Sequence, residues 1–297
     1  MNLTSPSQVK AWCIENGFHP NKVLGQNFLI DQNALKAIVE AGLEGLGGLE
    51  GLEGLEVLEI GPGLGVLTEE LLKRGCRVTA VEKDPVLAAR LAESLGNPEG
   101  LEVITGDALD WIQQLPKISD FRSQISGAQI SGAQDLQAAG TVRTFSCMIS
   151  NLPYQAGTRI LLELVKSRTI PQMTVLVQSE VADRLAASEG SKTRGLAGVW
   201  AQLDYEVEIV RKVSASCFWP RPAIGSTVVR LIRHSRNVDL SAKERDIFYR
   251  LTKQAFEHRR KQLGSVFKDL IQSTARAEEL SNQQWIELSK GLSNADT

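Results

Sequence analysis

The stretch Val57-Leu58-Glu59-Ile60-Gly61-Pro62-Gly63-Leu64-Gly65 decides the fold of this chain of 297 residues. A short run of mostly apolar, β-forming side chains leads directly into glycines, and a helix pattern over 67–73 follows. Glycines between a strand and a helix let the backbone approach a ligand closely, where any Cβ would clash. The stretch therefore predicts a strand, a ligand-binding turn and a helix, which together open an α/β sheet.

The same alternation of strand and helix patterns continues along the chain. We expect further strands at 77–81, 101–104, 145–149, 173–178, 205–213 and 227–232. Helices are expected at 31–41, with Asp31 as N-cap, and at 85–95, 159–166 and from Glu180 onward. Such alternation favours right-handed crossovers and a parallel sheet.

The C-terminal part of the chain has a different pattern. After Arg236 it is wholly helical, with helices expected at 242–255, 260–271 and 278–290. We place a domain boundary near 234–240, so that residues 1–236 form the α/β domain and residues 237–297 a small helical domain. The helical part contains the densest basic cluster in a chain of net charge −2, Arg259-Arg260-Lys261, which is a candidate for phosphate contacts.

Two low-complexity segments interrupt the α/β pattern. Residues 43–56 are a Gly-Leu-Glu triplet repeat, in which frequent glycine disfavours a stable helix. Residues 118–140 contain Gln-Ile-Ser-Gly-Ala twice in tandem. We interpret the first segment as a surface linker without catalytic content and the second as a flexible insertion.

The composition is that of a soluble globular protein, with 42% hydrophobic and 23% charged residues. No apolar run approaches the roughly 18 residues that span a bilayer, and the N-terminal segment 1–6 has neither the basic nor the apolar region of a signal peptide. The cysteines lack CxxC spacing and stand at 13, 76, 147 and 217. We therefore expect a cytoplasmic protein with free thiols, without a membrane segment or a metal site.

Acidic residues follow the second and third predicted strands. Glu82 stands about 20 residues beyond the glycines, where an acid can accept both hydroxyls of a ribose, and Asp107 follows the next strand. Val66 replaces the third small residue of a dinucleotide fingerprint, and Pro62 removes a backbone donor, so a pyrophosphate is disfavoured. A nucleoside without phosphates fits, with Glu82 on the ribose and Asp107 on adenine, and S-adenosylmethionine is such a ligand.

Asn151-Leu152-Pro153-Tyr154 follows the fourth strand. The Asn151 side chain and a backbone carbonyl fixed by Pro153 supply two acceptors beside an aromatic face, which suit an exocyclic amino group on a flat base. By itself the tetrapeptide is also typical of a strand-ending turn. Its place after the glycines, Glu82 and Asp107 favours the target side of a methyl-transfer site.

Together these motifs resemble the ribosomal RNA adenine N6,N6-dimethyltransferase family, in particular its bacterial small-subunit (16S) members. The matching segments run in the family's order from about residue 22 to residue 263: 25–29, 59–65, Glu82, 106–108, 151–154, Phe218-x-Pro220-x-Pro222 and Phe256-x-x-Arg259-Arg260-Lys261. The resemblance implies a Rossmann-like class I methyltransferase sheet, mostly parallel with an antiparallel last strand. It also implies a small all-helical C-terminal domain that recognises RNA.

The resemblance assigns roles to individual residues. Contacts to S-adenosylmethionine are implied for Asn27, Leu29, Gly61, Glu82, Asp107 and Asn151. The acceptors that hold the target amine would be the Asn151 side chain and the carbonyl of Leu152 or Pro153. Tyr154 and Phe218 would stack the extruded adenine from its two faces. Contacts to the RNA backbone are implied for Arg221, Arg259, Arg260 and Lys261.

The implied reaction is the dimethylation of two adjacent adenosines in a hairpin loop near the 3′ end of 16S ribosomal RNA. Single-stranded loops are natural targets when bases must be splayed out. The partner would be this RNA within the immature small ribosomal subunit, with a role in subunit biogenesis. We expect the enzyme to act as a monomer.

The chain departs from the family pattern in three places. Ser179 stands where the family usually has Lys, Ala223-Ile224-Gly225 replaces a charged-Val-Asp segment, and Arg194 replaces an aromatic residue. These positions are RNA-facing or support such positions in our interpretation, so the departures bear on RNA affinity more than on cofactor binding.

Three alternatives remain open at this point. A related large-subunit RNA adenine methyltransferase that confers antibiotic resistance shares the cofactor motifs, although the segment from Phe256 to Lys261 favours the small-subunit enzyme. An assembly or transcription factor could keep the fold without catalysis, but the intact acidic residues and Asn151 argue against it. A nicotinamide-dependent dehydrogenase is disfavoured by Val66.

Overall fold

The computed structural model describes residues 1–21, 23–47, 51–115, 144–234, 238 and 240–295. Contacts divide the chain into two compact units: Met1–Ala182 with Glu208–Ile232, and Asp183–Val207 with Arg233–Thr297. The division expected from the sequence, 1–236 and 237–297, differs because residues 183–207 lie with the C-terminal helices. The insertion at 118–140 falls outside the described residues. No helix in the described ranges has the length and apolar character to cross a bilayer.

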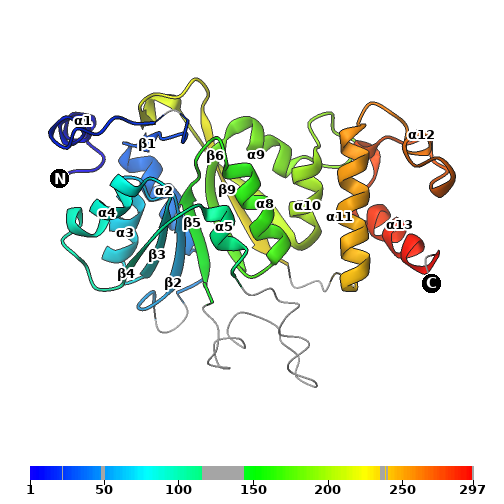
Figure 1. Ribbon diagram of the computed structural model, residues 1–297, viewed down its shortest axis with the longest axis horizontal. Helices are drawn as coiled ribbons and strands as arrows, with labels where there is room; N and C mark the ends of the chain where they lie inside the picture. The colour runs from blue at the N-terminus through cyan, green and yellow to red at the C-terminus, as the bar shows by residue number, and fades with distance from the viewer. Residues whose placement is uncertain (22, 48–50, 116–143, 235–237, 239, 296–297) are drawn as a thin grey trace, which may run out of the picture. The chain divides into compact units, whose positions relative to one another are not determined.

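A seven-stranded sheet forms the centre of the first unit, in the order β4-β3-β2-β5-β6-β9-β7 (Figure 1). Its strands are β2 (Glu56–Ile60), β3 (Arg77–Glu82), β4 (Leu101–Thr105), β5 (Cys147–Asn151), β6 (Gln172–Gln178), β7 (Tyr205–Val213) and β9 (Ser226–Arg233). The pairs β2–β3, β3–β4, β2–β5 and β5–β6 are parallel, whereas β9 runs antiparallel to β6. The expected mostly parallel sheet is confirmed, and its parallel strands end at one common edge.

Helices cover this sheet because their apolar faces need burial. They are α2 (Gln32–Leu43), α3 (Val66–Lys73), α4 (Pro85–Ser94), α5 (Ala108–Ile112), α8 (Gly157–Ser167) and the start of α9 (Ser179–Ala186). In Figure 1, α5 and α8 lie in front of the sheet, and these two helices contact each other. Side chains from α2, α3 and α4 form one buried cluster with β2, β3 and β5, including Leu35, Leu67, Leu91, Val57, Val78 and Ile149.

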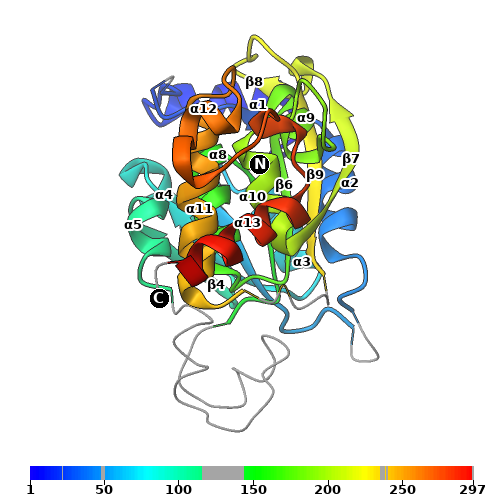
Figure 2. The same cartoon turned by 90° about the vertical axis from the view of Figure 1, so that its right-hand side faces the viewer.

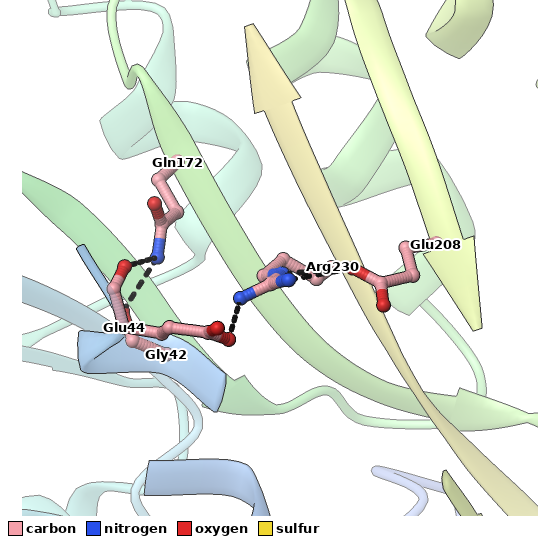
Figure 3. Close-up of polar contacts among 5 residues, drawn as sticks. All are labelled: Gly42, Glu44, Gln172, Glu208 and Arg230. Atoms are coloured by element: carbon pink, nitrogen blue, oxygen red, sulfur yellow. Dashed lines mark hydrogen bonds and ion pairs between the residues drawn. The ribbon is translucent and has the colours of Figure 1, made fainter. Parts of the chain in front are cut away.

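Helix α2 shows how local sequence fixes these positions. The Asp31 carboxylate accepts a hydrogen bond from the Ala34 N–H at 2.8 Å, so the expected N-cap is confirmed. Near the C-terminus a Cβ on Gly42 would come within 2.4 Å of the Ile149 side chain, so the close approach to β5 requires glycine. Gln172 then donates to the Gly42 and Glu44 carbonyls at 2.9 and 3.3 Å, which satisfies the end of the helix (Figure 3).

Arg230 on β9 joins the same end of α2 to the edge of the sheet. Its guanidinium bonds the Glu44 carboxylate and, at 2.7 Å, the Glu208 carboxylate on β7 (Figure 3). Arg230 therefore links the end of α2 to the strands β9 and β7.

The Gly-Leu-Glu repeat is more than the surface linker expected from its sequence. Leu46, Leu52 and Leu55 are partly buried and pack against the cluster that underlies α2 and α3. The Gly54 N–H donates to the Gly75 carbonyl at 2.8 Å and so fixes the repeat beside the loop before β3. The prediction of a linker rested on the frequent glycines, which disfavour a helix, and did not consider that the leucines between them could pack against the core.

The second unit is helical, as expected for residues 237–297. It contains α10 (Leu196–Asp204), α11 (Ala242–Glu257), α12 (Leu263–Phe267) and α13 (Asn282–Ala295), with 3-10 turns at Lys268–Leu270 and Ala277–Glu279. Helix α11 packs against α13 (Figure 2) and against α10. Arg245 on α11 bonds both oxygens of Asp204 at the end of α10, at 2.7 and 2.9 Å, and both side chains are nearly buried.

The helix expected at 260–271 was too long. Lys268 has a positive φ of 42°, and the backbone N–H groups of Leu263 and Gly264 bond the carbonyls of Ala275 and Ser273 at 2.8 and 2.9 Å. The chain therefore folds back after Phe267. The last helix likewise begins at Asn282 and not at 278.

Candidate active site

A cavity of about 160 Å³ lies at the carboxyl edge of the parallel strands. Its walls are segments that each follow a strand, at 60–63, 81–83, 106–108 and 151–156, together with residues 23–28. The structure thus brings together Gly61, Glu82, Asp107 and Asn151, which lie far apart in the sequence. In open α/β sheets this edge is where ligands bind.

The glycine loop follows β2 and has a conformation that other residues rarely adopt. Gly63 and Gly65 have φ of 59° and 89°, and a Cβ on Gly65 would come within 2.6 Å of the Leu91 side chain on α4. The Gly63 N–H donates to the Glu82 carboxylate at 3.1 Å. The end of β3 therefore holds the loop in place.

Glu82 is 6% exposed and receives two backbone hydrogen bonds. Its Oε1 accepts from the Asp84 N–H at 2.8 Å and its Oε2 from the Gly63 N–H. Burial raises the pKa of this carboxyl, and the backbone bonds oppose the rise. Each oxygen keeps a further lone pair, so the group can accept both hydroxyls of a ribose.

Asp107 caps α5 and faces the same cavity. Its Oδ1 accepts from the Leu109 N–H at 2.8 Å, and its Oδ2 lies 2.7 Å from the Lys83 ammonium. The hydrogen bond from Lys83 is the main cause that lowers the pKa of Asp107, so the group is an ionised acceptor. The sequence interpretation missed Lys83, whose position directly after Glu82 at a strand end was the available signal.

The Asn151 side chain is oriented by a residue 124 positions away. Its Nδ2 donates to the Asn27 carbonyl at 3.1 Å, which leaves Oδ1 as an acceptor without a partner among the described residues. The Pro153 carbonyl accepts from the Gly157 N–H at 2.7 Å, whereas no described backbone N–H donates to the Leu152 carbonyl. Of the two carbonyls considered from the sequence, that of Leu152 keeps both lone pairs free of described backbone donors, whereas that of Pro153 keeps one.

Tyr154 lines the cavity, and its hydroxyl is held by a hydrogen bond. The hydroxyl lies 2.6 Å from the Ser226 Oγ at the start of β9. Burial raises the pKa of Tyr154, so the phenol is neutral at physiological pH. Its backbone is close to Gly25, where a Cβ would come within 3.0 Å of the Tyr154 N.

Segment 23–28 forms one wall of the cavity and is held by hydrogen bonds to neighbouring segments. Gln26 donates to the Asp84 carboxylate at 2.8 Å, and Asn27 contacts Asn151 as described. Phe28 lines the cavity and stacks on Trp219 with ring centroids 6.4 Å apart. The sequence interpretation gave Phe28 no role of its own in the site.

Leu29 and Phe218 do not line this cavity, and their direct contacts to the cofactor and to the base stay predictions. They face each other in the antiparallel pair β1 (Phe28–Leu29) and β8 (Phe218–Trp219). Their side chains are 1% and 2% exposed and belong to the hydrophobic core. Alternation along a strand explains this, because Phe28 faces the cavity and its neighbour must then face the core.

The basic candidates for RNA contacts differ in their surroundings. Arg221 in the first unit and Arg260 and Lys261 in the second are exposed. The Arg259 guanidinium is engaged inside the second unit, where it bonds the Lys192 carbonyl and lies 3.5 Å from the Glu278 carboxylate. Arg259 therefore has a structural contact that the sequence did not reveal.

The departures from the family pattern also have defined places. The Ser179 N–H and Oγ both bond the Gly225 carbonyl at 3.0 Å, so two of the departures contact each other. Arg194 is 3% exposed and donates to the Asn282 side chain at 2.9 Å within the helical unit. It supports that unit from inside and presents no surface to RNA.

The sequence also predicts free thiols and no metal site. All four cysteines are free thiols. Within the ranges that the structure describes, no group of three or more His, Cys, Asp or Glu side chains is placed to hold a metal ion.

A Rossmann-like sheet with a glycine loop, two acids on successive strands and an Asn-Leu-Pro-Tyr turn defines a methyltransferase that uses S-adenosylmethionine. A family model described as ribosomal RNA adenine dimethylase matches residues 17–291, and the chain belongs to this family. It is an enzyme that dimethylates adenine in ribosomal RNA with S-adenosylmethionine. The dehydrogenase alternative is therefore wrong.

Individual relatives agree with this assignment. The chain is 35% identical to ribosomal RNA small subunit methyltransferase A of Moorella thermoacetica over 88% of this chain and 83% of that protein. It is 39% identical to the protein of the same name from Deinococcus radiodurans over 77% and 67% of the two chains.

Solved structures share the fold. A dimethyladenosine transferase from Plasmodium falciparum matches with a TM-score of 0.66 and 20% identity, covering 90% of this chain and 97% of that one. The 23S ribosomal RNA methyltransferase ErmE matches with a TM-score of 0.60 and 23% identity, covering 90% of this chain and all 100% of that one. These likenesses confirm the expected class I methyltransferase fold.

Proposed function

We propose that this protein dimethylates two adjacent adenosines in a hairpin loop near the 3′ end of 16S ribosomal RNA, within the immature small subunit in the bacterial cytoplasm. The names of the relatives support the choice of subunit. The observation that carries the chemistry is the pair of available acceptors, Asn151 Oδ1 and the Leu152 carbonyl, beside the Tyr154 ring.

S-adenosylmethionine supplies an electrophilic methyl group on a sulfonium. In this proposal the Glu82 carboxylate accepts the ribose hydroxyls, and the ionised Asp107 accepts the adenine amino group. Asn27 and Gly61 line the part of the cavity assigned to the methionine portion. The cavity fits such a group because backbone N–H groups hold the carboxylates of Glu82 and Asp107 as acceptors at its wall.

The target amine is neutral but poorly nucleophilic, because its lone pair is delocalised into the purine ring. Asn151 Oδ1 and the Leu152 carbonyl accept its two N–H bonds and so hold the lone pair toward the methyl donor. Pro153 fixes the turn, and its own carbonyl already accepts one hydrogen bond from Gly157. The nitrogen–methyl bond would form as the sulfur–methyl bond breaks, a neutral thioether would leave, and the positively charged amine would then lose one proton to solvent. No strong base is required before transfer, and correct positioning supplies most of the rate.

Tyr154 stacks the extruded base from one face in this proposal. Phe218 and Leu29 also have an indirect role. They pair in β1–β8 and hold the segment that bears Asn27 and Phe28 over the cavity.

Contacts to the RNA backbone are proposed for the exposed residues Arg221, Arg260 and Lys261. Each is free to place a cation against a phosphate, and such contacts give affinity without sequence preference. For Arg259 we propose a supporting role, because it holds the loop around Lys192.

The proposal is tested with purified enzyme, labelled S-adenosylmethionine and small subunits that lack the modification. We expect four methyl groups per subunit, two on each adenosine, and none on isolated large-subunit RNA. Binding of S-adenosylmethionine without transfer to small subunits would instead support an assembly factor. Transfer to large-subunit RNA alone would support the antibiotic-resistance type of enzyme.

A further inference from the structure

We propose that Ser226 is a positioning residue for methyl transfer, because its hydroxyl fixes the outer end of the Tyr154 ring. The inference rests on the proposed stacking role of Tyr154. The two oxygens are 2.6 Å apart, and the Ser226 side chain is fully buried at 0% exposure. The serine lies 72 positions along the chain from the tyrosine and does not line the cavity itself.

Ser226 is held in place independently of Tyr154. It opens β9 and pairs with Gln178 at the end of β6, in an antiparallel register that is continuous over seven residue pairs. Its neighbours on both sides are bound to the start of α9: the Gly225 carbonyl accepts from the Ser179 N–H at 3.0 Å, and Thr227 Oγ1 lies 3.0 Å from Ser179 Oγ. The hydroxyl that meets Tyr154 therefore belongs to a rigid part of the sheet.

The two hydroxyls at the start of β9 serve different partners. Successive side chains of a strand point to opposite faces, so Ser226 meets Tyr154 whereas Thr227 meets Ser179. Thr227 is 1% exposed and hence as buried as Ser226. The pair offers a matched comparison within one strand, because only Ser226 reaches the stacking residue.

Anchoring both ends of the ring limits how Tyr154 can move. Its backbone end packs closely against Gly25, and its hydroxyl is bonded to Ser226. A ring fixed in this way presents one orientation to the incoming base. Methyl transfer requires the amine, the methyl group and the sulfur to be in line, so a small error in the orientation of the base lowers the rate. Loss of the bond is therefore expected to reduce turnover and to leave the affinity for RNA, which depends mainly on phosphate contacts, nearly unchanged.

The test is a double-mutant cycle on kcat and KM with small subunits as substrate. We expect Ser226→Ala and Tyr154→Phe each to lower kcat by about fivefold, the value of one buried neutral hydrogen bond, with KM unchanged. The double variant should be no slower than either single variant, because both remove the same bond. Tyr154→Phe keeps the ring and changes a half-buried residue, so it tests the bond even if Ser226→Ala folds poorly.

Thr227→Val is the control, since it removes a buried hydroxyl from the same strand with little change of shape. Its effect on kcat should be small and should add to that of Tyr154→Phe. Additive effects of Ser226→Ala and Tyr154→Phe, or a wild-type kcat in folded Ser226→Ala, would overturn the inference. Tyr154→Ala distinguishes this inference from the proposed function. Full methyl transfer by Tyr154→Ala would contradict the stacking role of Tyr154. Loss of transfer in Tyr154→Ala together with a wild-type kcat in Tyr154→Phe would contradict only the role of Ser226.

Discussion

Asn151 and Asn27 are joined by a hydrogen bond of 3.1 Å in which the Asn151 amide donates to the Asn27 carbonyl. This contact decides which end of the Asn151 amide faces the cavity. It also joins segment 23–28 to Asn151, so in the proposed mechanism the cofactor side and the target side of the site share one contact.

Asn151→Ala is expected to lower kcat by at least about 100-fold, because it removes a group that acts in the transition state. Asn151→Asp should weaken S-adenosylmethionine binding as well, since it sets a carboxylate oxygen against the Asn27 carbonyl. Titration calorimetry with S-adenosylmethionine and methyl transfer measure the two effects. Asn33→Ala, on the exposed side of α2, is the control. Asn151→Ala with unchanged kcat would contradict this role.

Lys83→Met is expected to make S-adenosylmethionine binding sensitive to acid. The Lys83 ammonium holds the pKa of Asp107 below its ordinary value. Without it the pKa rises, so Asp107 loses its charge at a higher pH and stops accepting the adenine amino group. The dissociation constant of the variant should therefore rise as the pH falls toward 3.8, the ordinary pKa of an aspartate, whereas that of the wild type should rise only at lower pH. Parallel pH profiles for the two proteins would show that Lys83 does not control Asp107.

Glu59 predicts a pH dependence of stability. It is 1% exposed, and burial raises its pKa from 4.5 to about 8, although the hydrogen bond from Thr68 opposes the rise. The folded state then keeps a proton that the unfolded state releases, so the contribution of Glu59 to stability is full below pH 4.5 and is lost as the pH rises toward 8. Glu59→Gln should remove this fall, as measured by urea unfolding across the pH range. An identical slope in both proteins would mean that Glu59 is ionised when folded.

The Arg245–Asp204 pair is expected to stabilise the helical unit through burial. Arg245→Met leaves the Asp204 carboxylate buried without a partner, at a cost of about 3–5 kcal/mol. The pair Arg250–Asp246 on the same helix, 2.8 Å apart and mostly exposed, is the control. Arg250→Met should change the free energy of unfolding by about 1 kcal/mol or less. Equal effects of the two variants in denaturant unfolding would refute the distinction.

Arg260→Ala and Lys261→Ala are expected to weaken RNA binding and to reduce its salt slope by about one for each phosphate contact removed. Arg259→Ala should act differently, since its guanidinium already bonds the Lys192 carbonyl. We expect a lower Tm and a nearly unchanged salt slope for that variant. RNA-binding titrations at several salt concentrations distinguish the two cases, and a salt slope that falls equally for all three variants would place Arg259 on the RNA.

The sequence predicted the sheet and the four cavity positions because both depend on local patterns. Short apolar strands, the Asp31 cap and glycines before a helix each leave a signal within a few residues. Strand ends of a parallel sheet then meet at one edge, which brought Gly61, Glu82, Asp107 and Asn151 together without knowledge of their contacts.

What the sequence did not predict depends on distant partners or on burial. Helix α10 is buried on most sides, so it lacks the polar face that marks an amphipathic helix. The Ser226–Tyr154 contact depends on the β6–β9 register, and the inward direction of Phe218 depends on its pairing with Leu29. The early end of α12 follows from hydrogen bonds to the returning chain at 273–275.

The leucines of the Gly-Leu-Glu repeat give this part of the chain an unusual tolerance of length change. Leu46, Leu52 and Leu55 pack against the core at spacings that are multiples of three residues. Loss or gain of one triplet, the usual product of slippage when a repetitive gene is copied, would bring an equivalent leucine to each anchoring position. We therefore expect insertion of one Gly-Leu-Glu triplet here to leave β2 and the glycine loop in place.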